Sequence, residues 1–255
     1  MNEKWPQTLW VVRHGQSAGN VARDLAEANG HPVIDIAHRD IDTPLSSLGE
    51  DQSVALGRWF GSLPPGRRPQ VVLCSPYVRA LETARLMLDA AQIPRREIVF
   101  RVDERLREKE FGILDRLTRL GILARHPELD AQRQHVGKFY FRPPGGESWC
   151  DVILRLRSLV EMASREHGGE RVLMVAHQVT VNCMRYLIEG LNEHEILAVD
   201  RMGDVPNCSV TSYEYDRALP LHGGLALRQV NWVAPLRHAG APVTVGKDVP
   251  AAPKP

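Results

Sequence analysis

The residues whose types are best suited to catalysis follow a short apolar run near the N-terminus. Residues 9–12 are apolar and favour a buried strand of a parallel sheet. Arg13 and His14 come directly after this run, and Gly15 permits a tight turn close to a ligand. An arginine offers a rigid fork of donors suited to phosphate, and a neutral imidazole is a competent nucleophile. The pattern therefore predicts a strand that delivers a reactive histidine to the carboxyl edge of a sheet.

Two further polar residues, Ser17 and Asn20, follow the turn and can either cap a helix or donate to a bound anion. The tripeptide at 13–15 alone also fits a histidine that is merely hydrogen-bonded at a strand edge. The longer pattern Arg-His-Gly-Gln-Ser-x-x-Asn is more specific, and it resembles the signature of the histidine phosphatase superfamily, which includes the cofactor-dependent phosphoglycerate mutases. The resemblance implies that His14 is a nucleophile that becomes phosphorylated, with Ser17 and Asn20 beside the substrate.

Arg79 belongs to a second motif, in the first turn of a helix that is predicted to follow the strand over 71–75. Pro76 opens that helix, so Arg79 joins its positive end. A lone arginine there more often makes a surface salt bridge. The string over 75–84 nevertheless resembles the superfamily motif Ser-x-x-x-Arg-Ala-x-x-Thr-Ala, whose arginine grips the transferred phosphoryl group.

A charged run over 104–112 would by itself be typical of a solvated loop. The superfamily pattern Leu-x-Glu-x-x-aromatic-Gly places an acid/base carboxylate at Glu108 and leaves Glu104 and Glu110 as surface charges. After Gly112 the chain departs from the family, which often continues toward a Glu-Gly pair where this sequence has Asp-Arg.

The apolar run over 172–176 predicts another buried strand, and it ends in His177 and Gln178. Two histidines at strand ends of one parallel sheet can converge, and the superfamily pairs them in this way. Gln178 replaces the usual glycine and matches the fructose-2,6-bisphosphatase branch. The basic and aromatic stretch over 138–148 resembles the same branch, which implies substrate contacts for Gln178 and Arg142. Its final Gly-Glu-Ser equally fits a helix start capped by Ser148.

These residue types suit phosphoryl transfer through a covalent phosphohistidine. Attack on phosphorus spreads negative charge over the nonbridging oxygens, for which Arg13, Arg79 and His177 are candidate donors. The leaving alkoxide needs a proton, which Glu108 would supply as a carboxylic acid before it activates water. The scheme needs no metal or other cofactor, and the sequence contains neither a P-loop nor a dinucleotide fingerprint.

The elements that must position these residues alternate between strand and helix patterns. Strands are predicted over 9–13, 71–75, 98–102, 172–176, 209–215 and 225–232, and helices over 48–63, 78–91, 149–167 and 180–191. This order predicts a single α/β domain with a mostly parallel central sheet flanked by helices on both faces.

The predicted domain spans 1–233 and carries two polar segments, 21–44 and 112–146, that we interpret as insertions over the active edge of the sheet. Residues 234–255 are rich in proline and alanine without a period, which predicts a flexible tail.

Composition excludes several function classes. Among 255 residues, 32 Lys and Arg nearly balance 31 Asp and Glu, so no global charge attracts nucleic acid or a membrane surface. No segment predicts a signal peptide or a membrane span, and we expect a cytoplasmic protein. The expected partner is a small phosphorylated metabolite, and the sequence predicts no oligomeric state.

The leading hypothesis is a phosphatase, a phosphoric monoester hydrolase acting through His14. The alternative is a cofactor-dependent phosphoglycerate mutase. Such mutases usually show a Tyr-Gly-x-Leu-x-Gly stretch, whereas residues 111–116 lack its second glycine. A noncatalytic module that binds a phosphorylated ligand is the third hypothesis, and such a module would not need to retain both the nucleophile and the acid.

Overall fold

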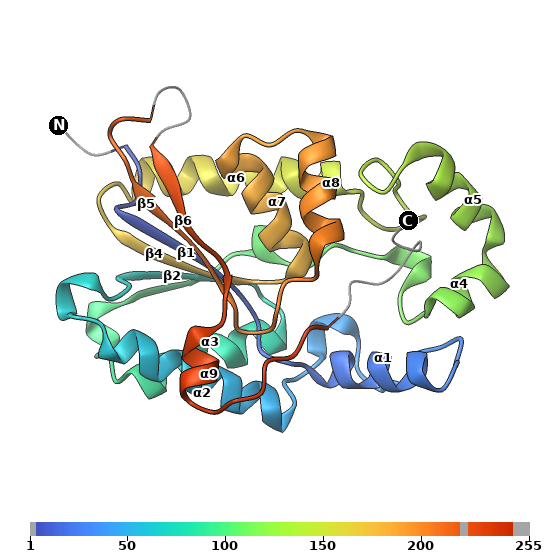
Figure 1. Cartoon of the computed structure of the whole chain (residues 1–255), viewed down its shortest axis with the longest axis horizontal. Coiled ribbons are helices and arrows are strands. Elements are labelled where there is room, and N and C mark those ends of the chain that lie inside the picture. The colour runs from blue at the N-terminus through green and yellow to red at the C-terminus, as the bar shows by residue number, and fades with distance from the viewer. Residues whose placement is uncertain (1–3, 220–223, 247–255) are drawn as a thin grey trace.

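The computed structural model describes residues 4–219 and 224–246, and its centre is a six-stranded sheet (Figure 1). The strand order is β3-β2-β4-β1-β5-β6, in which β1 to β4 run parallel while β5 and β6 pair antiparallel. The strands are β1 Thr8–Arg13, β2 Val71–Cys74, β3 Val99–Val102, β4 Arg171–Ala176, β5 Val210–Tyr215 and β6 Leu225–Trp232. The prediction of a mostly parallel sheet is confirmed.

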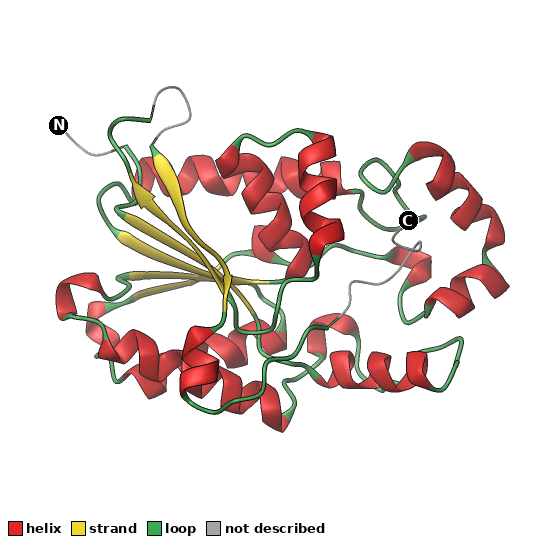
Figure 2. Cartoon of the chain, viewed as in Figure 1, coloured by secondary structure: helices red, strands yellow, loops and turns green. Residues whose placement is uncertain are grey.

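Helices cover both faces of this sheet, as predicted (Figure 2). α6, α7 and α8 pack on one face of the sheet, and α2, α3 and α9 pack on the other. The helices are α1 Ala18–Ala28, α2 Ser47–Ser62, α3 Val78–Ala91, α4 Arg119–Arg125, α5 Pro127–Val136, α6 Trp149–Glu166, α7 Gln178–Glu189, α8 Glu193–Met202 and α9 Ala234–His238.

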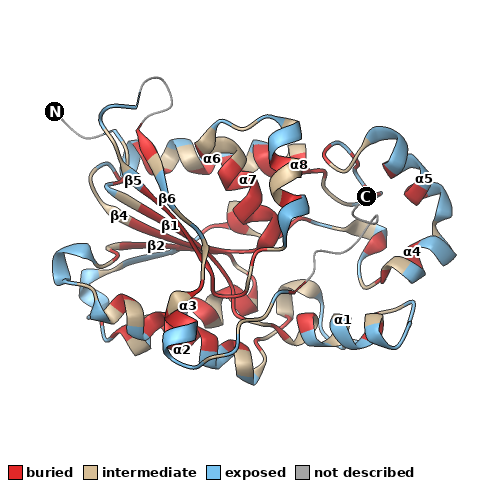
Figure 3. Ribbon diagram, viewed as in Figure 1, coloured by how far each residue is buried: buried red, intermediate tan, exposed pale blue. Residues whose placement is uncertain are grey.

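Alternation along the strands explains the two layers. On β1, Leu9 and Val11 join the core under α6 and α7, while Trp10 and Val12 join the core under α2 and α3. The central strands β1, β2 and β4 are almost fully buried, whereas the edge strands β3 and β6 and the helices α4 and α5 are much more exposed (Figure 3). Strands buried on both faces need continuous apolar runs, which is why the central strands could be predicted from sequence.

The carboxyl ends of three neighbouring strands meet at one edge of the sheet. β4 lies between β2 and β1, with Arg13 opposite Ala176 and Cys74 opposite Val175. The residues that follow these strands therefore come together although they lie far apart in sequence.

The two segments that interrupt the alternation contact each other beside this edge. Val33 and Leu117 form an isolated antiparallel bridge, and the Ile34 amide donates to the Arg116 carbonyl at 2.8 Å. A small separate core beneath α4 and α5 consists of Leu114, Leu117, Ile122, Leu129 and Phe141. The segments 21–44 and 112–146 thus form one substructure rather than two independent loops.

The chain after residue 233 differs from the predicted flexible tail. Ala234–His238 forms α9, and Leu236 is fully buried in the core beside α2 and α3. Gln52 of α2 donates to the Pro242 carbonyl at 2.8 Å and to the Thr244 hydroxyl at 2.9 Å. Residues 234–246 are therefore part of the packed domain, because Leu236 completes one of its cores; residues 247–255 lie outside the described part.

None of the helices in the described ranges is long and apolar enough to cross a membrane.

Candidate active site

His14 lies one residue beyond β1, at the edge where the strands end. Its amide donates to the Ala176 carbonyl at 2.9 Å, which extends the pairing of β1 with β4. The next residue must be small, because a Cβ on Gly15 would lie 2.5 Å from the Gly49 carbonyl oxygen of α2. The tight turn therefore holds the His14 side chain, which is only 3% exposed, against the start of a helix.

Hydrogen bonds define the tautomer of His14. Its Nδ1 lies 2.6 Å from the Gly15 carbonyl oxygen, which can only accept, so Nδ1 carries the proton. Its Nε2 then bears a lone pair and accepts from Nε of Arg79 at 3.2 Å. Burial, reinforced by the charges of Arg79 and Arg13, holds the pKa of His14 well below its usual 6.5. The imidazole is neutral at pH 7, which the nucleophilic role predicted from sequence requires.

The two predicted clamp arginines are buried and fixed. Arg79, in the first turn of α3, donates through Nη1 to the Asp40 carbonyl at 2.6 Å and through Nη2 to the Asp40 carboxylate at 3.2 Å. Arg13 donates to the carbonyls of Val205 and Gly246. Arg79 thus binds His14 with one donor and Asp40 with the others.

His177 directly precedes α7 and is fully buried, with its ring centroid 5.1 Å from that of His14. Its Nε2 is 2.7 Å from the Ser75 hydroxyl, while its buried Nδ1 has no hydrogen-bond partner within residues 4–219 and 224–246. Burial and the charge of Arg79 hold the pKa of His177 well below 6.5. The predicted convergence of the two histidines is present in the structure, with both rings neutral.

Glu108 lines the same cavity as His14 and is 9% exposed. Its Oε1 accepts from the Lys109 amide at 2.8 Å, and its backbone carbonyl accepts from Arg155 of α6 at 3.1 Å. Glu104 and Glu110 are exposed, as the family pattern implied.

The sequence did not predict the ion pairs and hydrogen bonds that hold the backbone around Glu108. Arg155 also donates to the Arg105 carbonyl at 2.5 Å and pairs with Glu147 at 3.0 Å, and Arg107 pairs with Glu147 at 2.7 Å. The Gly-Glu-Ser stretch was the available signal, because its glutamate is the residue that joins both arginines.

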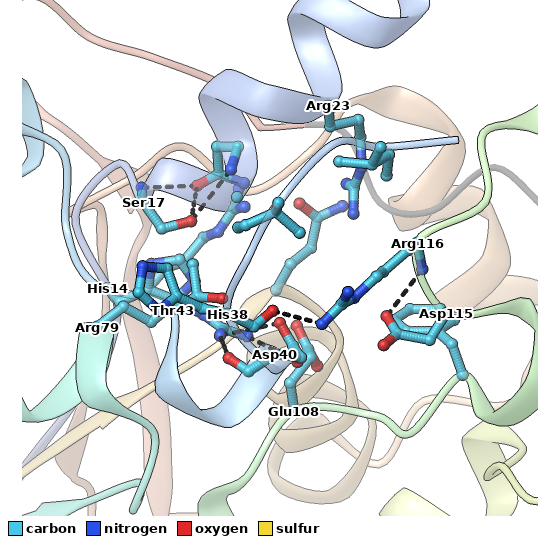
Figure 4. Close-up of a pocket in the computed structure, with 17 residues that line it drawn as sticks. His14, Ser17, Arg23, His38, Asp40, Thr43, Arg79, Glu108, Asp115 and Arg116 are labelled. Carbon is cyan, nitrogen blue, oxygen red and sulfur yellow. Dashed lines mark hydrogen bonds and ion pairs between the residues drawn. The ribbon is translucent and has the colours of Figure 1, made fainter. Parts of the chain in front are cut away.

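The cavity at this edge has a volume of about 90 Å³, which exceeds the space of one water several times over. Of the residues predicted from sequence, Arg13, His14, Ser17, Asn20, Arg79, Glu108 and Gln178 line it (Figure 4). Ser17 and Asn20 form the capping box of α1, and Gln178 donates to Asp204 at 2.9 Å. The two alternatives for Ser17 and Asn20 therefore coexist: they cap the helix and border the cavity.

Arg142 does not line this cavity, contrary to the expectation for the 138–148 stretch. Its Nε bonds Asp151 of α6 at 2.7 Å, and Phe139 and Phe141 are buried in the cores. Ser148 caps α6 in a capping box with Asp151. The stretch is structural here because its aromatic side chains fill core positions and its polar side chains secure a helix start.

Several residues that line the cavity were not predicted from sequence, among them Arg23, Asp40 and Arg116. These three come from the segments 21–44 and 112–146, where no motif marks them. Within the described ranges, no group of three or more histidine, cysteine or carboxylate side chains is placed to hold a metal ion.

Comparison with known proteins identifies the family of this chain. The family model described as "Histidine phosphatase superfamily (branch 1)" matches residues 9–222. The chain is 30% identical over 180 residues to a 6-phosphofructo-2-kinase/fructose-2,6-bisphosphatase of Caenorhabditis elegans, a match that covers 70% of this chain and 33% of that longer protein. It is 29% identical over 209 residues to 2,3-bisphosphoglycerate-dependent phosphoglycerate mutase 2 of Gloeobacter violaceus, covering 81% and 85% of the two chains.

Among solved structures, a mycobacterial glucosyl-3-phosphoglycerate phosphatase in complex with inorganic phosphate is similar at a TM-score of 0.67 and 27% identity. The match covers 90% of this chain and 99% of that one. The family model extends over most of the sequence, and its range takes in the strand ends, both histidines and both clamp arginines. The chain therefore belongs to branch 1 of the histidine phosphatase superfamily.

Proposed function

We propose that this protein is a phosphatase that hydrolyses small phosphomonoesters through a phosphohistidine intermediate at His14. The observation that carries the proposal is the environment of His14 Nε2. This atom bears a lone pair and faces Nε of Arg79 at 3.2 Å, in a cavity that Glu108 also lines. Nucleophile, anion donor and acid are thus within one small space.

The reaction divides into two displacements at phosphorus. In the first, His14 Nε2 attacks phosphorus, the bond to the leaving oxygen breaks, and protonated Glu108 gives that oxygen its proton. In the second, the Glu108 carboxylate takes a proton from water, the water oxygen attacks phosphorus, and the phosphorus–nitrogen bond breaks. Inorganic phosphate leaves, and His14 and Glu108 return to their starting protonation states.

The guanidinium groups of Arg13 and Arg79 and the buried ring of His177 stabilise the charge that develops on the nonbridging oxygens. Arg13 and Arg79 are held by hydrogen bonds before substrate arrives, so little reorganisation is needed during the reaction. Removing one such donor typically costs about 3–4 kcal/mol of transition-state stabilisation.

A phosphoglycerate mutase is the second candidate, because the Gloeobacter relative with that name aligns with most of the chain. A mutase must keep its phosphoenzyme long enough to donate the group again. Residues 111–116 lack the second glycine of the mutase stretch, and a structural neighbour with 27% identity is a phosphatase. Both observations favour hydrolysis.

Incubation with p-nitrophenyl phosphate and with 3-phosphoglycerate separates the candidates. We expect steady release of phosphate from p-nitrophenyl phosphate, no formation of bisphosphoglycerate, and an acid-labile phosphoenzyme on rapid quenching. His14→Ala should abolish both turnover and the phosphoenzyme. Equal phosphate release by wild type and His14→Ala would refute the mechanism, and transfer between the hydroxyls of phosphoglycerate would identify a mutase.

A further inference from the structure

The cavity contains more positive groups than one phosphoryl group requires. Arg13 and Arg79 lie with His14, while Arg23 and Arg116 line the cavity as well. Figure 4 shows the side chains of Arg23 and Arg116 on the side away from His14 and Arg79. The four arginines therefore divide into a pair at the nucleophile and a pair across the cavity.

Arg116 is held in place by contacts with the opposite segment. Its carbonyl accepts from the Ile34 amide at 2.8 Å, its amide donates to the Asp115 carboxylate at 2.9 Å, and its guanidinium donates to the His38 carbonyl at 2.7 Å. Its backbone has a φ of 59°, a left-handed conformation that is uncommon for a residue with a side chain. Such strained positions concentrate at functional sites, because the surrounding structure must over-determine them.

Arg23 reaches the cavity from α1. It lies three residues after Asn20, so helical spacing places both on the same face, and both line the cavity. Its side chain is half-buried. Two arginines that come from separate segments thus flank one space, as anion recognition by several guanidinium forks requires.

The carboxylates of the cavity have other contacts or roles. Asp40 forms an ion pair with Arg79 at 3.0 Å, on the nucleophile side, and Glu108 is the proposed acid. The carboxylate of Asp115 accepts from the backbone amide of Arg116. Apolar side chains of Ile34, Ile36 and Phe111 line the remaining wall, where a carbon skeleton would lie.

We propose that Arg23 and Arg116 form a second anion subsite, so that the preferred substrate carries a carboxylate or a second phosphate besides the phosphoryl group that His14 attacks. This inference rests on the proposed function and specifies its substrate class. A neutral or singly phosphorylated compound would occupy only the His14 half of the cavity.

Two matched substrate pairs test the subsite. Glycerol 3-phosphate and 3-phosphoglycerate differ by a carboxylate, and glucose 6-phosphate and glucose 1,6-bisphosphate differ by a phosphate. For at least one pair we expect wild type to prefer the more anionic member, by kcat/KM, about tenfold or more. Arg23→Gln and Arg116→Gln should each reduce that preference severalfold. The control Arg125→Gln, which changes an exposed arginine in the same segment as Arg116, should keep it.

The two pairs also distinguish a carboxylate site from a phosphate site. Absence of any preference in wild type, or a preference that both variants retain, would overturn the subsite. If wild type hydrolyses none of these compounds and no p-nitrophenyl phosphate, the proposed function fails instead. The subsite is then decided with His14→Asn by calorimetry, in which the same pairs must differ in Kd and the arginine substitutions must remove that difference.

Discussion

At the level of single residues, the proposed mechanism gives Arg79 two roles, because it would bind phosphoryl oxygens and also keeps His14 unprotonated. Arg79 touches His14 Nε2, and its charge contributes with burial to the low pKa of His14. A proton and a phosphoryl group compete for the same lone pair, and the arginine disfavours the proton while it attracts the phosphoryl group. His14 therefore needs no separate base to be reactive at neutral pH.

The loss of kcat/KM on replacing Glu108 should be larger for leaving groups that need protonation more. For glycerol 3-phosphate, Glu108→Gln should lower kcat/KM by about 10²–10⁴-fold. For p-nitrophenyl phosphate the loss should be much smaller in the first step, because p-nitrophenolate leaves without protonation. Steady-state kcat/KM values on both substrates check this, with Glu104→Gln as the exposed control. Equal losses on the two substrates would exclude an acid role for Glu108.

Asp40 should compete with phosphate for Arg79. Both terminal nitrogens of Arg79 contact Asp40, so a phosphoryl group must displace this carboxylate. We expect Asp40→Asn to lower the inhibition constant of inorganic phosphate about tenfold, since hydrogen bonds to charged groups are the stronger ones. The control is Asp42→Asn, because Asp42 pairs with exposed Arg39 in the same turn. A higher inhibition constant in Asp40→Asn would mean that Asp40 supports anion binding instead.

At the level of elements, the chemistry depends on where strands end and helices begin. Sequence predicted His14 and His177 because apolar runs precede them, and it predicted Arg79 because a proline marks the start of α3. It indicated a helix after Gly15 but gave α1 no bounds, because residues 21–44 were interpreted as a polar insertion although Val21, Leu25 and Ala26 have helical spacing.

The remaining cavity residues were beyond sequence reasoning for a different reason. Arg23, Asp40 and Arg116 lie in segments whose proximity comes from backbone pairing, such as the bridge of Val33 with Leu117. Neither segment has a periodic sequence pattern from which this pairing could be predicted. Likewise, only resemblance placed Arg142 at the substrate, and the structure pairs it with a helix cap.

Ser148 provides a test of its structural role. It caps α6, and its hydroxyl accepts from the Asp151 amide at 3.2 Å. Ser148→Ala should lower the free energy of unfolding by about 1 kcal/mol, measured by urea denaturation, while kcat/KM stays unchanged. Ser158→Ala, in the middle of the same helix and exposed, should change stability by less than about 0.5 kcal/mol. A rise in KM without loss of stability would instead indicate substrate contact at Ser148.

At the level of the whole molecule, the buried neutral histidines link the active site to acid stability. In the unfolded chain His14 and His177 titrate near 6.5, whereas in the folded protein the pKa of each lies well below that value. Below pH 6.5 the unfolded state therefore binds protons that the folded state does not, and stability must fall as pH decreases.

Urea unfolding in phosphate-free buffer at pH 7.5 and 5.5 measures this effect. We expect the free energy of unfolding to decrease by up to about 1.4 kcal/mol per pH unit for each histidine below pH 6.5, and to be flat above it. His177→Asn should remove about half of the decrease. Most carboxyl groups stay ionised over this range, so a decrease that His177→Asn leaves intact would assign the acid sensitivity to other groups.

The bond between Arg13 and the Gly246 carbonyl, 3.1 Å long, joins residues 233 positions apart. Its consequence concerns timing during translation. At ~5–20 residues per second, a ribosome needs about 10–50 s to make the chain between these two residues. During that interval the nascent chain contains His14 and Arg13, but Arg13 still lacks the Gly246 carbonyl that holds its guanidinium in the folded protein. We therefore expect the growing chain not to hydrolyse phosphoesters until residue 246 has been made.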